Sequence, residues 1–241
     1  MSEVFKKWAV SYSGCDGGDI GSPENRAIWV SGIEWGGGQT ASDIEEYLLS
    51  DESRPPQGYD DWKINLKHRF NWQVMKLLSI VNGGHYSEYK QFAEKHRPFT
   101  RGSKGYFKLN LFPLAFKDTS HSLWTSDFAK ITGFETKSLY LEWCRENRHA
   151  SIRLWCKAQR PKLVVCLGKT FESDFKKSFS DSECLVSKEV INGNEIAWLI
   201  NEDGCLVVIL PFMLNRNGLT KNADIQVVGE RIAGLLQSRQ A

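Results

Sequence analysis

Short apolar runs that alternate with helical segments constrain this chain more than any other feature of its sequence. The runs are RAIWVSGIEW, GYFKLNLFPL, RPKLVVCLGKT and GCLVVILPFM, and each contains a glycine or a proline near its end. Such runs are typical of strands that are buried on both faces of a parallel sheet. Segments between them, such as TASDIEEYLLS, HRFNWQVMKLLSIVNGG and FESDFKKSF, have the apolar spacing of helices. The alternation predicts an α/β fold with a central, mainly parallel four-stranded sheet.

The other segments are expected to complete a single domain over residues 26–241. Residues 1–25 are rich in Gly, Ser and Asp and are expected to form an irregular N-terminal lead-in. A hairpin is expected in CLVSKEVINGNEIAWLIN, with its turn near Asn192-Gly193 or Gly193-Asn194. A long helix is expected from about Thr136 to Gln159, and an amphipathic helix in NADIQVVGERIAGLLQS. The residues expected on the buried face of the long helix are Leu139, Trp143 and Leu154.

Composition excludes few partners but several classes of protein. The 31 Lys and Arg residues nearly balance the 29 Asp and Glu residues, so a nucleic-acid binder would need its cations gathered on one face. No apolar run has the length of a membrane span, and MSEVFKKWAV lacks the apolar core of a signal peptide. None of the six cysteines forms a Cys-x-x-Cys pair, which favours reduced, partly buried thiols over a metal site. We therefore expect a soluble, intracellular protein without a metal ion.

Three polar segments are expected at the edge of the sheet where ligands bind, outside the carboxyl ends of the parallel strands. They are Glu34 with the glycines that follow it, Asn110 near the end of the second run, and LPFMLNRNG at the end of the fourth. Although these segments lie far apart in the sequence, the topology should bring them together. Their convergence is the main indication of a functional site.

The segment GIEWGGGQT is neither a dinucleotide-binding fingerprint nor a phosphate-binding P-loop. The amides of Gly36, Gly37 and Gly38 could approach a phosphate, and a flexible turn is an equally good interpretation. The adjacent Glu34 would be useful there if positive charge develops on the substrate or if a water must be deprotonated. Breaking a glycosidic bond meets both conditions. The structural alternatives for Glu34 are a helix N-cap and an ordinary surface residue.

Asn110 and the segment LPFMLNRNG each have a structural and a functional interpretation. A buried Asn needs hydrogen-bond partners, which could be structural groups or the edge of a nucleobase. Leu214 and Arg216 could enter a DNA stack as a wedge, contact a protein partner or fold back onto the core.

Taken in order, these segments resemble the uracil-DNA glycosylase superfamily over roughly residues 27–237. GIEWGGG resembles its first motif, and LNLFPLAF is similar to the Asn-Leu-x-Pro-Leu strand of the single-strand-selective branch. RPKLVVCLGK resembles the third strand, and LPFMLNRNG occupies the place of the His-Pro-Ser loop. RFNWQVMKLL resembles the Arg-Phe-Trp-x-x-Leu helix of some members.

The resemblance implies a three-layer α/β/α fold and a role for each matching residue. Glu34 would activate water or stabilise the sugar cation, and the amides of Gly36, Gly37 and Gly38 would hold a DNA phosphate. Asn110 would read the extruded base. The candidates for the aromatic residue that stacks on the base are Tyr59 and Trp62.

The loop after the fourth strand would fill the space that the extruded base leaves. Pro211 would shape this loop, while Leu214 and Arg216 would fill the vacated stack. Trp35 stands where the family has Pro, and Leu210 stands where it has His. These two departures widen the expected substrate from uracil to a uracil-like or modified base. The wedge-loop residues implied are Leu210, Pro211, Leu214, Asn215 and Arg216.

The sequence thus predicts a monofunctional DNA glycosylase, a hydrolase of base-excision repair that flips out its target base. No lysine is identified as a Schiff-base nucleophile, so strand cleavage is not expected. We expect DNA as the partner, no cofactor, no membrane association, a monomer, and a cytoplasmic, nucleoid-associated location.

Two other functions are compatible with the same residues. A non-catalytic module on the same fold would bind DNA or a nucleobase without releasing it. A nucleotide-sugar or dinucleotide enzyme would need a ribose-binding acid about 20 residues beyond the glycines. The acids in that region are Asp51, Glu52, Asp60 and Asp61.

Overall fold

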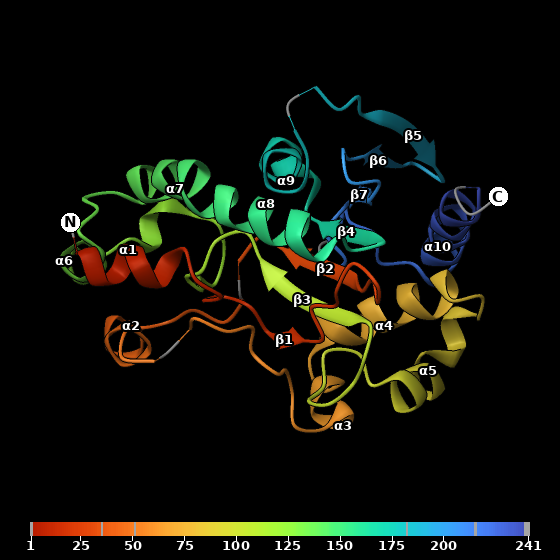
Figure 1. Cartoon of the computed structure of the whole chain (residues 1–241), viewed down its shortest axis with the longest axis horizontal. Helices are drawn as coiled ribbons and strands as arrows, with labels where there is room; N and C mark the ends of the chain where they lie inside the picture. Colours follow the sequence, from red (N-terminus) through yellow and green to blue (C-terminus); the bar gives the residue numbers. More distant parts are fainter. Residues whose placement is uncertain (1, 35, 51, 182, 215, 239–241) are drawn as a thin grey trace.

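The computed structural model describes residues 2–34, 36–50, 52–181, 183–214 and 216–238 (Figure 1). The strands are β1 (Gly17–Gly18), β2 (Ile28–Gly32), β3 (Tyr106–Asn110), β4 (Leu163–Leu167), β5 (Ser187–Ile191), β6 (Asn194–Ile200) and β7 (Leu206–Leu210). The α-helices are α1 (Glu3–Ala9), α2 (Ala41–Tyr47), α3 (Trp62–Asn65), α4 (Arg69–Val81), α5 (Tyr89–His96), α6 (Ser126–Thr132), α7 (Lys137–Glu146), α8 (Arg148–Gln159), α9 (Glu172–Phe179) and α10 (Asn222–Gln237). The 3-10 helices are η1 (Tyr86–Glu88), η2 (His121–Leu123) and η3 (Lys169–Phe171).

Over the described ranges, seven strands form one mixed sheet in the order β1-β3-β2-β4-β7-β6-β5. Strands β3, β2, β4 and β7 pair in parallel, while β1, β6 and β5 pair antiparallel to their neighbours. The predicted α/β class is confirmed. The sheet is larger than the four strands expected, because the β5–β6 hairpin extends one edge and Gly17–Gly18 extends the other.

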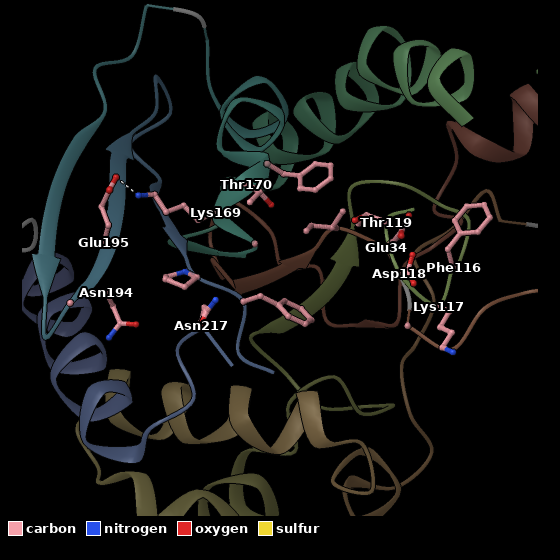
Figure 2. Close-up of a pocket in the computed structure, with 18 residues that line it drawn as sticks. Glu34, Phe116, Lys117, Asp118, Thr119, Lys169, Thr170, Asn194, Glu195 and Asn217 are labelled. Atoms are coloured by element: carbon pink, nitrogen blue, oxygen red, sulfur yellow. Dashed lines mark ion pairs between the residues drawn. The ribbon is translucent and has the colours of Figure 1, made fainter. Parts of the chain in front are cut away.

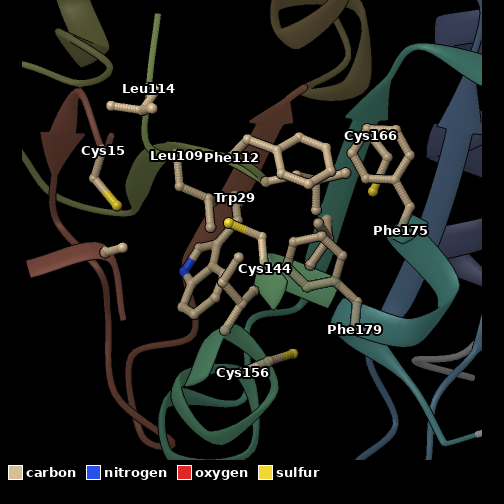
Figure 3. Close-up of a cluster of buried hydrophobic side chains, with 14 of the residues drawn as sticks. Cys15, Trp29, Leu109, Phe112, Leu114, Cys144, Cys156, Cys166, Phe175 and Phe179 are labelled. Atoms are coloured by element: carbon tan, nitrogen blue, oxygen red, sulfur yellow. The ribbon is translucent and has the colours of Figure 1, made fainter. Parts of the chain in front are cut away.

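Alternate residues of the parallel strands face two separate hydrophobic clusters. On one face, Trp29, Val164 and Val207 pack with buried residues of α1, α6, α7, α8 and α9. On the other face, Val30 and Val165 pack with buried residues of α4, α5 and α10. Figure 3 shows the first cluster, in which Trp29 lies with Cys144, Phe112, Phe175 and other apolar side chains. Burial on both faces explains why these strands are continuous apolar runs.

Two expectations about helices are wrong. The lead-in is not wholly irregular, because residues 3–9 form α1 and place Phe5 and Trp8 in the first hydrophobic cluster. The expected helix from Thr136 to Gln159 is two helices, α7 and α8, which meet at Asn147. The side-chain amide of Asn147 donates to the carbonyl of Trp143, which also accepts from the backbone N–H of Asn147, and such side-chain bonds bend helices.

Two of the three side chains expected on the buried face of this segment are exposed. Leu139 and Leu154 are 46% and 67% exposed, so neither lies on a buried face as expected. Trp143 is partly buried against the first cluster, as expected.

The β5–β6 hairpin turns at Asn192 and Gly193, one of the two positions expected. Both residues have positive φ, 48° and 78°, as a two-residue turn of type I′ requires. None of the helices in the described ranges has the length and apolar character needed to cross a bilayer.

Candidate functional site

A pocket of about 590 Å³ opens at the carboxyl ends of strands β2, β4 and β7 (Figure 2). Its lining comes from the residues directly after these strands, the loop 116–119 after β3, and the turn of the β5–β6 hairpin. Parallel strands place their carboxyl ends at the same edge of a sheet, which explains how distant segments meet here. This is the edge at which the sequence predicts a site.

Glu34, two residues beyond β2, lies in the wall of this pocket. Its side chain is only 7% exposed, and Oε2 lies 3.5 Å from Nζ of Lys137. Its other oxygen, Oε1, has no hydrogen-bond partner among the described residues. Burial raises the pKa of Glu34 to about 7; the Lys137 ammonium opposes this change, and the Asp118 carboxylate adds to it. Glu34 is therefore a carboxyl group that changes protonation near neutral pH.

Lys137 is the first residue of α7 and is almost completely buried, with 1% of its side chain exposed. Its Nζ lies 3.9 Å from the centroid of the Phe116 ring, a cation–π distance. Burial lowers the pKa of the ammonium, and the Glu34 carboxylate opposes that change. No local sequence signal marks Lys137 as a site residue, because a lysine at the start of a helix is ordinarily exposed.

Among the described residues, the aromatic side chains that line the pocket are Phe116, Phe171 and Phe212 rather than those expected. Phe212 stacks on Phe70, with ring centroids 5.6 Å apart and planes at 27°, so its orientation is fixed by helix α4. Phe171 packs edge-on against Phe112 at 6.0 Å. These rings give the pocket apolar walls suited to a flat ligand.

Tyr59 and Trp62, the expected stacking residues, are not among the pocket residues. The Tyr59 hydroxyl donates to Asp16 at 2.7 Å and accepts from the Asn71 amide at 3.1 Å. Trp62 packs against the second hydrophobic cluster. Both side chains therefore have structural partners away from the pocket.

Asn110, expected to read the base, is buried at the end of β3 and does not line the pocket. Its Nδ2 donates to the carbonyl of Gly14 at 3.0 Å. Its Oδ1 lies so close to Gly32 that a Cβ there would be 2.4 Å from it. Asn110 thus has the structural partner that was the alternative interpretation, and its placement does not support base reading.

Gly36, Gly37 and Gly38 form an exposed turn, and Gly36 lines the pocket. Gly37 and Gly38 have φ of 109° and 79°, a conformation that strains other residues. The helix that follows, α2, begins with a capping box in which Thr40 and Asp43 bond to each other's backbone. The capping box already uses the amides of Thr40 and Asp43, and the Asp43 carboxylate repels an anion, so any phosphate contact would rest on the turn.

The expected wedge loop is divided between core, pocket and surface. Leu210 is fully buried in β7, and Pro211 lines the pocket together with Phe212. Leu214 is half-buried and Arg216 is exposed, and neither lines the pocket. Asn215 lies outside the described residues.

The end of the pocket away from Glu34 contains an ion pair. Lys169, directly after β4, forms an ion pair with Glu195 of β6, as the dashed line in Figure 2 marks. Asn194 and Asn217 add amide groups nearby, whereas Glu34, Asp118 and Thr119 lie at the opposite end. The pocket thus has two carboxylates, Glu34 and Asp118, at one end and mixed donors and acceptors at the other.

Chemically, the site offers a buried carboxyl group that can exchange a proton near neutral pH, beside apolar walls. Within the ranges that the structure describes, no group of three or more His, Cys, Asp and Glu side chains is arranged to hold a metal ion. No protein-family model matches the chain, and no curated protein matches it.

Proposed function

We propose that the chain is a DNA glycosylase that takes a uracil-like or modified base out of DNA and hydrolyses its bond to deoxyribose. The observation that carries the proposal is the buried carboxyl group of Glu34 in the wall of a pocket of about 590 Å³. The pocket lies at the edge of the sheet where α/β proteins bind ligands. Its volume lies in the range of small-molecule sites, about 300–1,000 Å³.

The walls of the pocket suit a nucleobase. The rings of Phe116, Phe171 and Phe212 offer flat apolar contacts, and an extruded base is commonly held between such side chains. Asn194 and Asn217 offer the donors and acceptors that the edge of a base requires. These two amides, rather than that of Asn110, would form hydrogen bonds with the extruded base.

Hydrolysis would use Glu34 as the catalytic residue. The oxygen of a water bonds to C1′ while the C1′–N bond breaks, and the electron pair of that bond leaves with the base. Glu34 accepts a proton from the water, and its negative charge stabilises the oxocarbenium-like sugar. The proton then passes to the departing base or to solvent. A pKa of about 7 leaves roughly half of the Glu34 side chains ionised at neutral pH.

The fold supports the same proposal. Four adjacent parallel strands lie at the centre of the sheet, with helices packed on both faces, as a three-layer uracil-DNA glycosylase-like fold requires. We propose DNA as the partner of a monomeric enzyme, with the turn at Gly36 to Gly38 at the rim of the pocket as a phosphate contact. The reaction as proposed needs no cofactor.

A second candidate is a module that binds a nucleobase without cutting it. The Glu34–Lys137 pair favours this candidate, because two opposite charges that neutralise each other in a buried wall can serve binding alone. Such a module would show saturable DNA binding and would release no base.

The test is incubation with oligonucleotides that carry uracil and a panel of modified bases, followed by detection of abasic sites and free base. A Thr170→Trp variant fills the pocket from an exposed position, and Ser173→Trp adds the same bulk outside it. We expect base release from at least one oligonucleotide, about 100-fold slower in Thr170→Trp and within about twofold of wild type in Ser173→Trp. Full activity of Thr170→Trp would show that the reaction does not take place in this pocket. Saturable DNA binding without base release would establish the second candidate.

A further inference from the structure

Lys137 faces Glu34 from a different element and is held almost completely out of solvent. Its Nζ lies 3.5 Å from Oε2 of Glu34, which is longer than a direct charge-assisted hydrogen bond of about 2.8 Å. Neither this Nζ nor Oε1 of Glu34 has a hydrogen-bond partner in the described part of the chain. The lysine therefore acts on the carboxylate through its charge, and both of these unpartnered atoms are buried from solvent.

The surroundings fix the position of that charge. The ring of Phe116 covers the ammonium at 3.9 Å, and Lys137 is anchored to the first turn of α7, which Thr136 caps through its side chain. An ammonium with so little exposure cannot move to solvent without disturbing the packing of α7.

The other charged groups that face this pair lie in the loop after β3. Asp118 interacts with both Glu34 and Lys137 and carries the opposite sign to the lysine. Lys117 lines the same pocket but is exposed to solvent, which screens its charge. Lys137 is thus the buried positive charge that opposes both the burial of Glu34 and the repulsion from Asp118.

We propose that Lys137 is a positioning residue of the reaction: its buried charge, 3.5 Å from Oε2, stabilises the ionised form of Glu34, which accepts a proton from water. This inference rests on the proposed glycosylase function. Lys137 makes no contact with the substrate in this role and forms no bond to it.

The kinetic test measures single-turnover base release from pH 5 to pH 10, on the oligonucleotide that the panel identifies. The variants are Lys137→Met, Lys137→Arg and, as a matched control, Lys130→Met, which removes an exposed lysine of α6. An opposite charge at this distance changes the pKa of a carboxyl group by about 1–3 units. Lys137→Met should therefore move the acidic limb of the profile upward by about 1–3 pH units, slow the reaction at pH 7 by about 5- to 500-fold, and recover at high pH.

The two controls should behave differently from Lys137→Met. Lys137→Arg should restore much of the wild-type profile because it keeps the charge, and Lys130→Met should stay within about twofold of wild type. A purely structural role would lower the rate equally at every pH. That uniform loss, with an unmoved profile, would overturn the proposal.

A second measurement does not depend on activity. In protein labelled with ¹³C at the glutamate carboxyl carbon, the resonance missing from Glu34→Gln identifies Glu34, and its titration can be followed directly. We expect the midpoint to rise in Lys137→Met by about one pH unit or more, and Lys137→Gln serves if the methionine variant does not fold. A midpoint that moves by less than about 0.3 unit would overturn the role of Lys137. If no DNA yields free base, the glycosylase proposal fails, and this titration still decides whether Lys137 controls the charge of Glu34.

Discussion

Arg148 ties the N-terminal segment to the end of strand β3, and its replacement by methionine should destabilise the protein strongly. The side chain is fully buried at the start of α8. Its guanidinium donates to the carbonyl oxygens of Ala9, Ser11, Ser13, Asn110 and Leu111, at distances of 2.6 to 3.1 Å.

The magnitude follows from these carbonyls. Each buried carbonyl that loses its donor costs about 1–3 kcal/mol. The variant no longer has to desolvate a buried cation, which offsets several kcal/mol of the cost of the unpaired carbonyls. We expect Arg148→Met to lower the free energy of unfolding by about 3–5 kcal/mol, the usual cost of breaking a buried charged network. For a chain of this size the melting temperature should fall by about 6–20 °C.

The assay is urea unfolding followed by tryptophan fluorescence, with linear extrapolation to water. Arg153→Met on the same helix is the matched control, because Arg153 is 34% exposed and pairs with Asp181 at the surface. This control should lose about 1 kcal/mol or less. If Arg148→Met also stays within about 1 kcal/mol of wild type, the bonds from Arg148 to this carbonyl cluster do not stabilise the N-terminal segment.

Two further changes test the structural roles assigned above. Asn110→Ala should lower the free energy of unfolding by about 1–2 kcal/mol, because Gly14 loses its hydrogen-bond donor. The rate of base release per folded molecule should stay within about twofold of wild type. A rate about 100-fold lower in folded protein would show that Asn110 takes part in the reaction. His149 is buried without hydrogen-bond partners in the described ranges, and burial, with the nearby Arg148, lowers its pKa to about 3. Because this folded-state pKa is below the unfolded value, the stability that neutral His149 permits is present above about pH 6.5 and is lost as the pH falls toward 3. Between pH 7 and pH 4, the free energy of unfolding in urea should therefore fall by about 3 kcal/mol less in His149→Leu than in wild type. An equal fall in both proteins would contradict this linkage.

The elements of the parallel sheet could be predicted because their residues carry local signals. Strand β4 is a continuous apolar run behind Pro161 and before Gly168, and the Asn192-Gly193 turn has the chemistry of a tight hairpin. Helix α1 was missed because only tertiary packing of Phe5 and Trp8 identifies its buried face. At the break between α7 and α8, the side chain of Asn147 bonds to the carbonyl of Trp143, a local contact that helical periodicity does not reveal.

The site could be predicted only in outline. Glu34 could be predicted because it lies two residues beyond a buried strand, and the topology of parallel strands places such residues at the ligand edge. Asn110 has the same sequence context, yet its side chain turns to Gly14 of the N-terminal segment. Lys137 and Phe116 lie in segments whose approach to Glu34 depends on how α7 and the loop after β3 pack, and no local pattern encodes that packing.

The most direct test of the central claim is the single-turnover rate of base release by Glu34→Gln, with DNA affinity measured on the same preparation. Glu45→Gln, which changes an exposed acid of α2, is the matched control. A general base contributes about 10²- to 10⁴-fold, so Glu34→Gln should release base about 100-fold more slowly or worse while binding DNA within about threefold of wild type. A rate within about threefold of wild type would contradict the assignment of Glu34 as the catalytic residue.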